Sequence, residues 1–247
     1  MNIAKRGFVS TDSKDFSMES LEKLRIAGEE IHFLLNRDYP IRSAINFVGN
    51  RYQLSERQRT ALFRIISSEK SIQSRKNKEL SADDLSGQTV YIDGFNIIIT
   101  LETIFSGSML FLCMDGTIRD LAGLRGTYRM IDKTDVALKA IGNALENLRI
   151  KKAVFYLDKP VSNSGRLRQK ILCMLSDRHF ETEAFTENAV DPILEKKSHV
   201  ITADAIILDK CESWYNLTSY ILNRTYDKLI DIFEGKMPSE SIYTIKK

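Results

Sequence analysis

Short apolar segments alternate with amphipathic stretches from residue 89 onward, and this alternation constrains the fold more than any other feature. The apolar segments have the length of buried strands, and the stretches between them repeat their apolar residues every three to four positions, as helices do. The predicted strands are residues 89–92, 153–157, 181–185 and 199–202, and the predicted helices are residues 97–104, 133–148, 165–175 and 192–196. Alternating strands and helices imply an α/β fold: a mostly parallel sheet with helices on both faces.

Two further patterns accompany this alternation. The apolar segments 109–114 and 117–120 flank Asp115-Gly116, a dipeptide typical of a tight turn between antiparallel strands. The stretch 214–233 is amphipathic, so we expect helices there.

The first part of the chain predicts a small all-α domain of three short helices, in a layout that resembles a helix-turn-helix. Ser17 and Ser55 are candidate N-caps of the first and third helices, and Pro40 stands where the second can begin. Residues 67–88 are polar and lack apolar periodicity, so we expect a linker or exposed arm with a boundary near Asp84. The predicted domains are therefore 1–84, the basic helices plus linker, and 85–247, the α/β domain.

Charge is distributed unevenly along the chain. The net charge is +3, but the segment from Arg37 to Lys78 holds ten basic and three acidic residues, so it carries +7 and the remainder carries −4. A basic module beside a mildly acidic body suggests a partner that is a polyanion. The candidate phosphate contacts on the third helix are Arg57, Arg59 and Arg64; the alternative is the solvated face of a structural helix.

Several classes of protein are excluded. The apolar runs are far shorter than the roughly 20 residues that cross a bilayer, and no apolar stretch follows the charged first residues as in a secretory signal. We expect a cytoplasmic protein without a membrane partner, and a homo-oligomer remains possible. The cysteines are odd in number and widely spaced, which argues for buried thiols rather than disulfides or a zinc site. They are Cys113, Cys173 and Cys211.

Three of the predicted strands end in an aspartate: Asp93, Asp158 and Asp204. The carboxyl ends of parallel strands meet at one edge of a sheet, where functional groups gather. Each aspartate alone could simply cap the following helix. Three of them at one edge would repel each other unless a cation lay between them, and carboxylates are ligands that Mg²⁺ and Mn²⁺ prefer. The pattern therefore predicts a Mg²⁺ or Mn²⁺ site.

The loop after Asp158 leads into a helix and contains small hydroxyl residues and an arginine. Backbone N–H groups and a guanidinium in this position could hold a phosphate at the same edge as the carboxylates. The alternative is a plain capped turn with a solvated arginine. The candidate substrate-binding residues here are Ser162, Ser164 and Arg166.

The run Ile92-Asp93-Gly94-Phe95-Asn96 resembles the first-strand motif of PIN-like nucleases of the NYN branch, which have a Rossmann-like fold. The stretch 188–191, followed by 200–204, resembles the late motif of that fold. The resemblance implies an acidic site of Asp93, Asp158, Asp191 and Asp204, with Asn96 in support. Many PIN domains also place an acidic residue on a central helix, for which Asp132, Asp135 and Glu146 are candidates that no motif fixes. Asp135 is preferred because it would lie in the first turn of its helix, and Asp209, one helical turn past Asp204, is a further candidate.

The chain also resembles an uncharacterised prokaryotic family known only as a pair of domains of unknown function. The basic helical first part, the Asp115-Gly116 turn and the stretches 123–129 and 157–167 carry this resemblance, which covers most of the chain.

These observations predict a metal-dependent phosphodiesterase that cleaves nucleic acid, with RNA favoured. Asp93, Asp158 and Asp204 would bind Mg²⁺ or Mn²⁺, and Asp191 would complete the site or orient water. One alternative is a catalytically inactive PIN-like module that binds nucleic acid or protein. Another is a phosphohydrolase of haloacid dehalogenase type with Asp93 as nucleophile, against which Phe95 argues because that chemistry needs a second acidic residue there.

Overall fold

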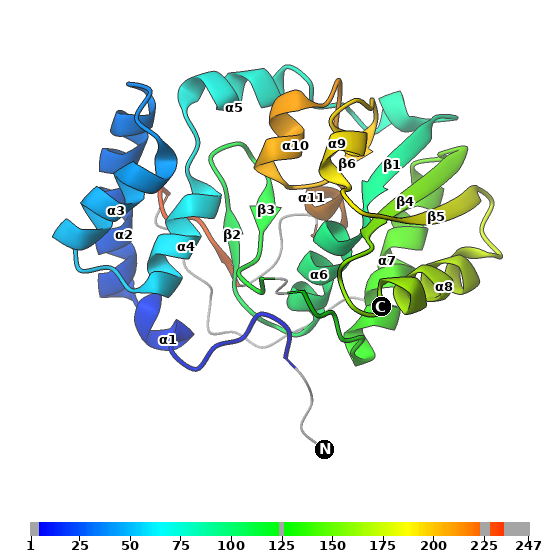
Figure 1. The fold of residues 1–247 in the computed structure, drawn as a ribbon, viewed down its shortest axis with the longest axis horizontal. Coiled ribbons are helices and arrows are strands. Elements are labelled where there is room, and N and C mark those ends of the chain that lie inside the picture. The colour runs from blue at the N-terminus through cyan, green and yellow to red at the C-terminus, as the bar shows by residue number, and fades with distance from the viewer. Residues whose placement is uncertain (1–4, 124–125, 223–227, 235–247) are drawn as a thin grey trace.

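The computed structural model describes residues 5–123, 126–222 and 228–234, and it contains a four-stranded parallel sheet (Figure 1). The strand order is β5-β4-β1-β6, and each neighbouring pair runs parallel. The strands are β1 (Thr89–Asp93), β4 (Lys152–Asp158), β5 (Glu181–Glu187) and β6 (Val200–Ile201). The predicted parallel sheet is confirmed.

Helices cover both faces of this sheet, as predicted. Val90 and Ile92 point into the core shared with the first group of helices, whereas Tyr91 packs against the second group, because successive strand residues face opposite sides. The first group is α6 (Gly94–Phe105), α7 (Asp132–Asn147), α8 (Ser164–Leu175) and α11 (Leu217–Leu222). The second group is α9 (Asp191–Leu194) and α10 (Ala205–Lys210).

A second sheet has the strand order β3-β2-β7, built from β2 (Leu110–Leu112), β3 (Ile118–Arg119) and β7 (Leu229–Ile230). β2 and β3 are antiparallel, which confirms the predicted turn, and β7 runs parallel to β2. The predicted helices over 214–233 are therefore wrong at β7, and residues 223–227 lie outside the described ranges. A short apolar run does not distinguish helix from strand, and here pairing with a distant strand decides the structure.

The first part of the chain forms α1 (Asp12–Asp15), α2 (Met18–Leu35), α3 (Ile41–Arg51) and α4 (Glu56–Ile65). Ser17 and Ser55 are the N-caps predicted for α2 and α4, and Ser55 forms a capping box with Gln58. The apolar sides of these helices share one core with Phe111 and Ile230 of the second sheet. The helices thus pack directly on that sheet, whose strands lie beyond residue 84 in the sequence. The domain boundary near Asp84 stays a prediction.

The segment predicted as a linker contains the helix α5 (Glu69–Lys76) and the short 3₁₀ helix η1 (Asp83–Leu85). Arg75 on α5 is only 3% exposed, and its guanidinium pairs with Asp115 at 2.5 Å and Asp209 at 2.7 Å. The expectation of an exposed arm is wrong for α5 because a buried ion-pair network, rather than an apolar stripe, anchors this helix.

Two expectations about composition can also be compared with the structure. Within the described ranges, no helix has both the length and the apolar character to cross a bilayer. Cys113 and Cys211 are buried as expected, whereas Cys173 is exposed on α8.

Candidate functional site

Asp93 ends β1 and caps α6, so its carboxylate lies at the carboxyl edge of the parallel sheet. One carboxylate oxygen accepts a hydrogen bond from the Thr202 hydroxyl at 2.9 Å, and the other accepts from the Asn96 backbone N–H at 3.4 Å. The side chain is buried, and burial raises the pKa of Asp93 to about 7. The charges of Asp204 and Asp158 act in the same direction.

Asp204 follows β6 and caps α10, where its carboxylate accepts from the Ile206 backbone N–H at 2.8 Å. The Asp204 backbone N–H donates to the Thr202 hydroxyl oxygen at 3.0 Å, so Thr202 contacts both aspartate residues. The Asn96 side-chain oxygen accepts from the Ala203 backbone N–H at 2.8 Å. The ends of β1 and β6 are therefore cross-linked by side-chain hydrogen bonds.

Asp158 and Asp191 lie at the same edge of the sheet as Asp93 and Asp204, and these four aspartates together are called the acidic edge below. Asp158 is the last residue of β4, and burial raises its pKa, although the Val190 backbone N–H donates to it and opposes that rise. Asp191 is the first residue of α9, and burial raises its pKa, assisted by the charges of Asp204 and Asp158. The four aspartates predicted from the strand ends and the late motif are thus electrostatically coupled.

The arrangement differs from the expected three-carboxylate cage. Within the described residues, no group of three His, Cys, Asp or Glu side chains is placed to hold a metal ion. In the same part of the chain, none of the ion pairs includes any of the four aspartates. Mg²⁺ often binds through one or two carboxylates, with water and substrate phosphates completing its shell. The donor chemistry therefore fits an open divalent-cation site rather than a closed one.

The candidates for an additional acidic ligand are engaged elsewhere. Asp132 pairs with Lys133 at 2.9 Å, and Glu146 pairs with Arg178 at 2.7 Å. Asp135 pairs with Lys170 at 2.8 Å, and Asp209 pairs with Arg75 at 2.7 Å. Each of these carboxylates thus has a cationic partner, whereas none of the ion pairs among the described residues involves the four aspartates at the sheet edge.

The predicted phosphate loop differs in exposure from residue to residue. Ser162 is exposed, but its backbone N–H already donates to the Gly126 carbonyl at 3.0 Å. Ser164 is buried, and its hydroxyl lies 3.4 Å from the Lys159 carbonyl that accepts its hydrogen bond. Arg166 is exposed in the first turn of α8. The side chains of Ser162 and Arg166 are therefore exposed to solvent, whereas that of Ser164 is not.

The three arginines predicted to contact phosphate are Arg57, Arg59 and Arg64, and all of them bind protein acceptors. Arg57 pairs with Asp12 at 2.8 Å and donates to two backbone carbonyls. Arg59 donates to the Asn50 side chain at 2.9 Å, beside the end of α3. Arg64 donates to the backbone carbonyl of Asp120. Arg57 and Arg64 thus join α4 to other parts of the molecule, whereas Arg59 joins α4 to α3.

Other basic side chains of the same +7 segment are exposed instead. They are Arg37, Arg42, Arg51, Lys70 and Lys76. These groups, rather than the three on α4, present positive charge to solvent.

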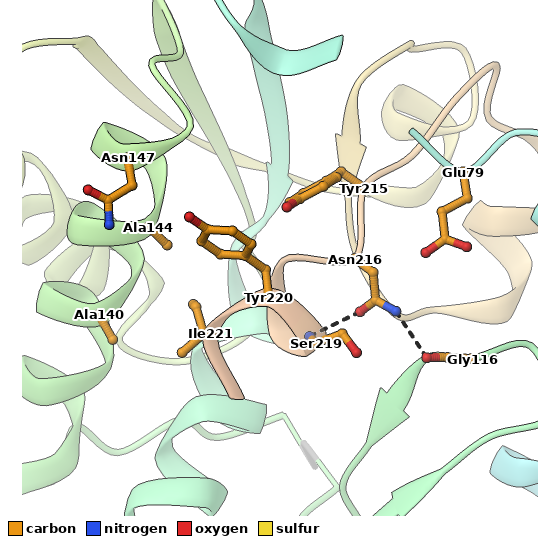
Figure 2. A pocket seen from close by; sticks show the side chains of 10 residues that line it. All are labelled: Glu79, Gly116, Ala140, Ala144, Asn147, Tyr215, Asn216, Ser219, Tyr220 and Ile221. Atoms are coloured by element: carbon orange, nitrogen blue, oxygen red, sulfur yellow. Dashed lines mark hydrogen bonds between the residues drawn. The ribbon is translucent and has the colours of Figure 1, made fainter. Parts of the chain in front are cut away.

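A cavity of about 790 Å³ lies away from the four aspartates. It lies beside α7 and α11, and Figure 2 shows Asn147 and Tyr220 on one side and Glu79 on the other. Tyr215 also lines it, although this side chain is only 6% exposed. None of the four aspartates lines this cavity, so it belongs to a different part of the molecule.

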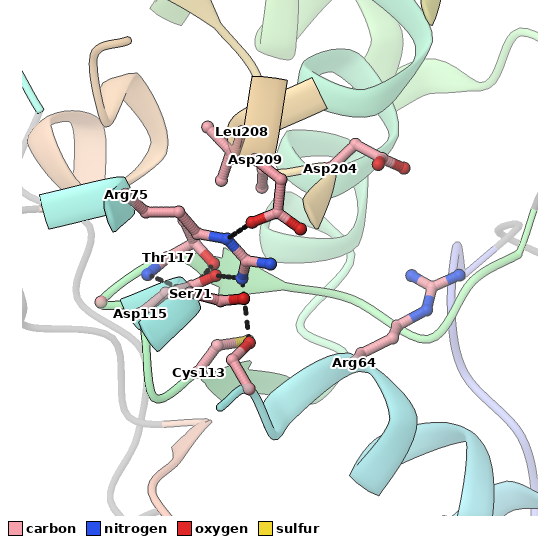
Figure 3. A network of polar contacts seen from close by, with 12 residues as sticks. Arg64, Ser71, Arg75, Cys113, Asp115, Thr117, Asp204, Leu208 and Asp209 are labelled. Atoms are coloured by element: carbon pink, nitrogen blue, oxygen red, sulfur yellow. Dashed lines mark hydrogen bonds and ion pairs between the residues drawn. The ribbon is translucent and has the colours of Figure 1, made fainter. Parts of the chain in front are cut away.

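Sequence reasoning missed two residues that support the site. Thr202 lies inside the late motif, two positions before Asp204. Its place at the end of a strand could therefore have indicated a side chain near the aspartates. Arg119 lies on β3, where its Nε donates to the Ala203 carbonyl at 2.6 Å, a long-range contact that its neighbours in the sequence do not indicate. Arg119 belongs to a buried network around Asp115, part of which Figure 3 shows with Arg75.

Comparisons with known proteins agree with an uncharacterised two-part family. Residues 82–220 match a family described as a domain of unknown function, DUF5616, and residues 23–78 match a protein of unknown function, DUF434. The uncharacterized protein MJ0935 of Methanocaldococcus jannaschii is 38% identical over 189 residues, which cover 76% of this chain and 89% of that protein. No solved structure matches the chain. The expected family is confirmed, and the nuclease assignment stays a prediction.

Proposed function

We propose that this chain, which belongs to the DUF5616 family, is a metal-dependent phosphodiesterase that cleaves nucleic acid, with RNA as the favoured substrate. One observation carries the proposal: four coupled aspartates share the carboxyl edge of a parallel sheet, and the pKa values of Asp93, Asp158 and Asp191 are raised there. Such a cluster of like charges is unfavourable unless a cation neutralises it. A divalent cation is the partner that these donors select.

The roles of the residues follow from their contacts. Asp93 and Asp204 would hold the ion, because Thr202 and Asn96 fix both strand ends. When bound, Mg²⁺ or Mn²⁺ stabilises the charge that develops on the phosphate during attack. Asp191 has a raised pKa, which suits it to accept a proton from the attacking water. Asp158 would complete the acidic edge.

A PIN-like assignment of the α/β part belongs to the same proposal. The first-strand motif supplies Asp93 and Asn96, and the late motif supplies Asp191 and Asp204. Their meeting at one edge of a parallel sheet is the arrangement that the resemblance implies.

Nucleic acid is the substrate class because the positive charge is concentrated in one part of the chain. The arginines on α4 bind protein acceptors, but five other basic side chains of the +7 segment are exposed to solvent. Exposed lysines and arginines provide contacts to phosphates that do not depend on sequence.

The test is cleavage of labelled single-stranded and structured RNA in the presence of Mn²⁺. We expect the wild-type protein to cleave, and Asp93→Asn and Asp204→Asn each to lose at least about 100-fold in rate, as a lost metal ligand would cause. Asp177→Asn is the matched control, because Asp177 is exposed beyond the end of α8, outside the proposed site, and this variant should leave the rate unchanged. Equal cleavage by all four proteins would exclude a metal site at this edge.

A second candidate function is a module that binds nucleic acid without cleaving it. Asp93 and Asp204 both act as helix N-caps, and Asp135 and Asp209 are paired away from the edge, which favours this alternative. Binding of the same RNA by the wild-type protein without Mn²⁺-dependent cleavage would select it.

A further inference from the structure

Arg119 connects the second sheet to the candidate site. Its side chain is buried, and its guanidinium donates to groups on three separate parts of the chain. Nε donates to the Ala203 carbonyl at 2.6 Å, one Nη pairs with the Asp115 carboxylate at 2.6 Å, and the other Nη donates to the Arg64 carbonyl at the end of α4.

The backbone of Ala203 is consequently held at both its N–H and its carbonyl. Its N–H donates to the Asn96 side chain at 2.8 Å, and its carbonyl accepts from Arg119. Ala203 stands between Thr202, which bonds to Asp93, and Asp204. The backbone direction at Asp204 is thus set by two side chains from outside its own loop.

The guanidinium of Arg119 is itself fixed in orientation. Asp115 is buried, accepts from the Thr117 hydroxyl at 2.6 Å and pairs with Arg75 at 2.5 Å, so its carboxylate has a single position (Figure 3). The N–H groups of a planar guanidinium point in fixed, diverging directions, so one arginine can donate to this carboxylate and to two carbonyls at once. The single ammonium group of a lysine cannot reproduce this geometry.

We propose that Arg119 is a positioning residue for the acidic edge, which holds Asp204 in place relative to Asp93 through the Ala203 carbonyl. The inference rests on the proposed function and adds to it a residue from the β2–β3 hairpin. The charge of Arg119 also interacts favourably with the Asp204 carboxylate. Because Arg119 also binds the end of α4, it links the basic helices to the site.

The variants Arg119→Lys and Arg119→Gln test this role in the full chain. Mn²⁺ binding is measured by electron paramagnetic resonance titration, and kcat and KM are measured on labelled RNA. We expect both variants to bind Mn²⁺ about 10- to 100-fold more weakly and to lose kcat by a similar factor, as changes to groups that orient metal ligands do. KM for RNA should stay within about threefold, because Arg119 is buried and away from the exposed basic side chains.

The matched control is Arg178→Gln. Arg178 also binds a carboxylate, that of Glu146 at 2.7 Å, and it lies outside the proposed site, so this variant should behave as wild type. Arg119→Lys keeps a cation beside Asp115. If the circular dichroism spectrum of Arg119→Gln is not native, Mn²⁺ binding and kcat are compared with wild type for Arg119→Lys alone.

Two negative results have different meanings. If the wild-type protein binds Mn²⁺ and cleaves RNA, but both Arg119 variants match the control, the positioning role is refuted and the phosphodiesterase proposal stands. If the wild-type protein neither binds Mn²⁺ nor cleaves RNA, the proposed function fails and the role of Arg119 fails with it.

Discussion

Replacing Asp93 with asparagine should make the metal-free protein more stable at pH 8 while removing its activity. The pKa of Asp93 rises from 3.8 to about 7 in the folded protein, chiefly because the carboxyl group is buried. The folded state therefore holds this proton more tightly than the unfolded chain, so stability falls as the pH rises from about 4 to 7. Over this window the cost of ionising Asp93 reaches roughly 4 kcal/mol at most.

Asparagine has nearly the same shape and no charge to desolvate. Its side-chain oxygen can still cap α6 or accept from Thr202, so the packing of the site should persist. We therefore expect Asp93→Asn and wild type to have similar free energies of unfolding at pH 4, and the variant to be more stable by about 2 to 4 kcal/mol at pH 8.

Urea denaturation between pH 4 and pH 8.5, with a chelator present, measures this difference. Asp177→Asn is the control, because it removes a carboxyl group that is exposed rather than buried, and it should not be more stable than wild type at pH 8. The reasoning is refuted if Asp93→Asn is no more stable than wild type at pH 8, since Asp93 would then carry no burial penalty.

Two further predictions concern stability. Arg75→Met should lower the free energy of unfolding by about 3 kcal/mol in urea denaturation, because Asp115 and Asp209 lose a buried cationic partner; a loss below about 1 kcal/mol would contradict a structural role for this network. Ser55→Ala should cost about 1 kcal/mol through loss of the α4 capping box. An unchanged midpoint of thermal unfolding in Ser55→Ala would show that the cap contributes nothing.

Local patterns predicted the parts of the fold that depend on nearby residues. The alternation of apolar residues located β1 and β4, and the serines before α2 and α4 marked where those helices begin. The aspartates at the strand ends could be placed at one edge because parallel strands share their carboxyl ends. These predictions needed only spacing along the chain.

Predictions that depended on distant partners were less successful. Arg75 makes α5 a packed helix through Asp115 and Asp209, which lie 40 and 134 residues away along the chain. β7 forms because it pairs with β2 across more than a hundred residues, a contact that its own short sequence does not encode.

The same limit applies to the candidate site. A helical pattern shows that Arg57 and Arg64 lie on one side of α4, but it does not reveal whether their donors meet solvent or a protein acceptor. Arg119 contacts Ala203 from 84 positions away, so no motif near the aspartates could indicate it.

The central claim is that the acidic edge binds a divalent cation, and anomalous diffraction from crystals soaked in Mn²⁺ tests it most directly. We predict an anomalous difference peak in contact with the carboxylate of Asp93 or Asp204, and loss of that peak in crystals of Asp204→Asn. A Mn²⁺ peak only at other carboxylates, or the same peak in the variant at full height, would contradict the claim.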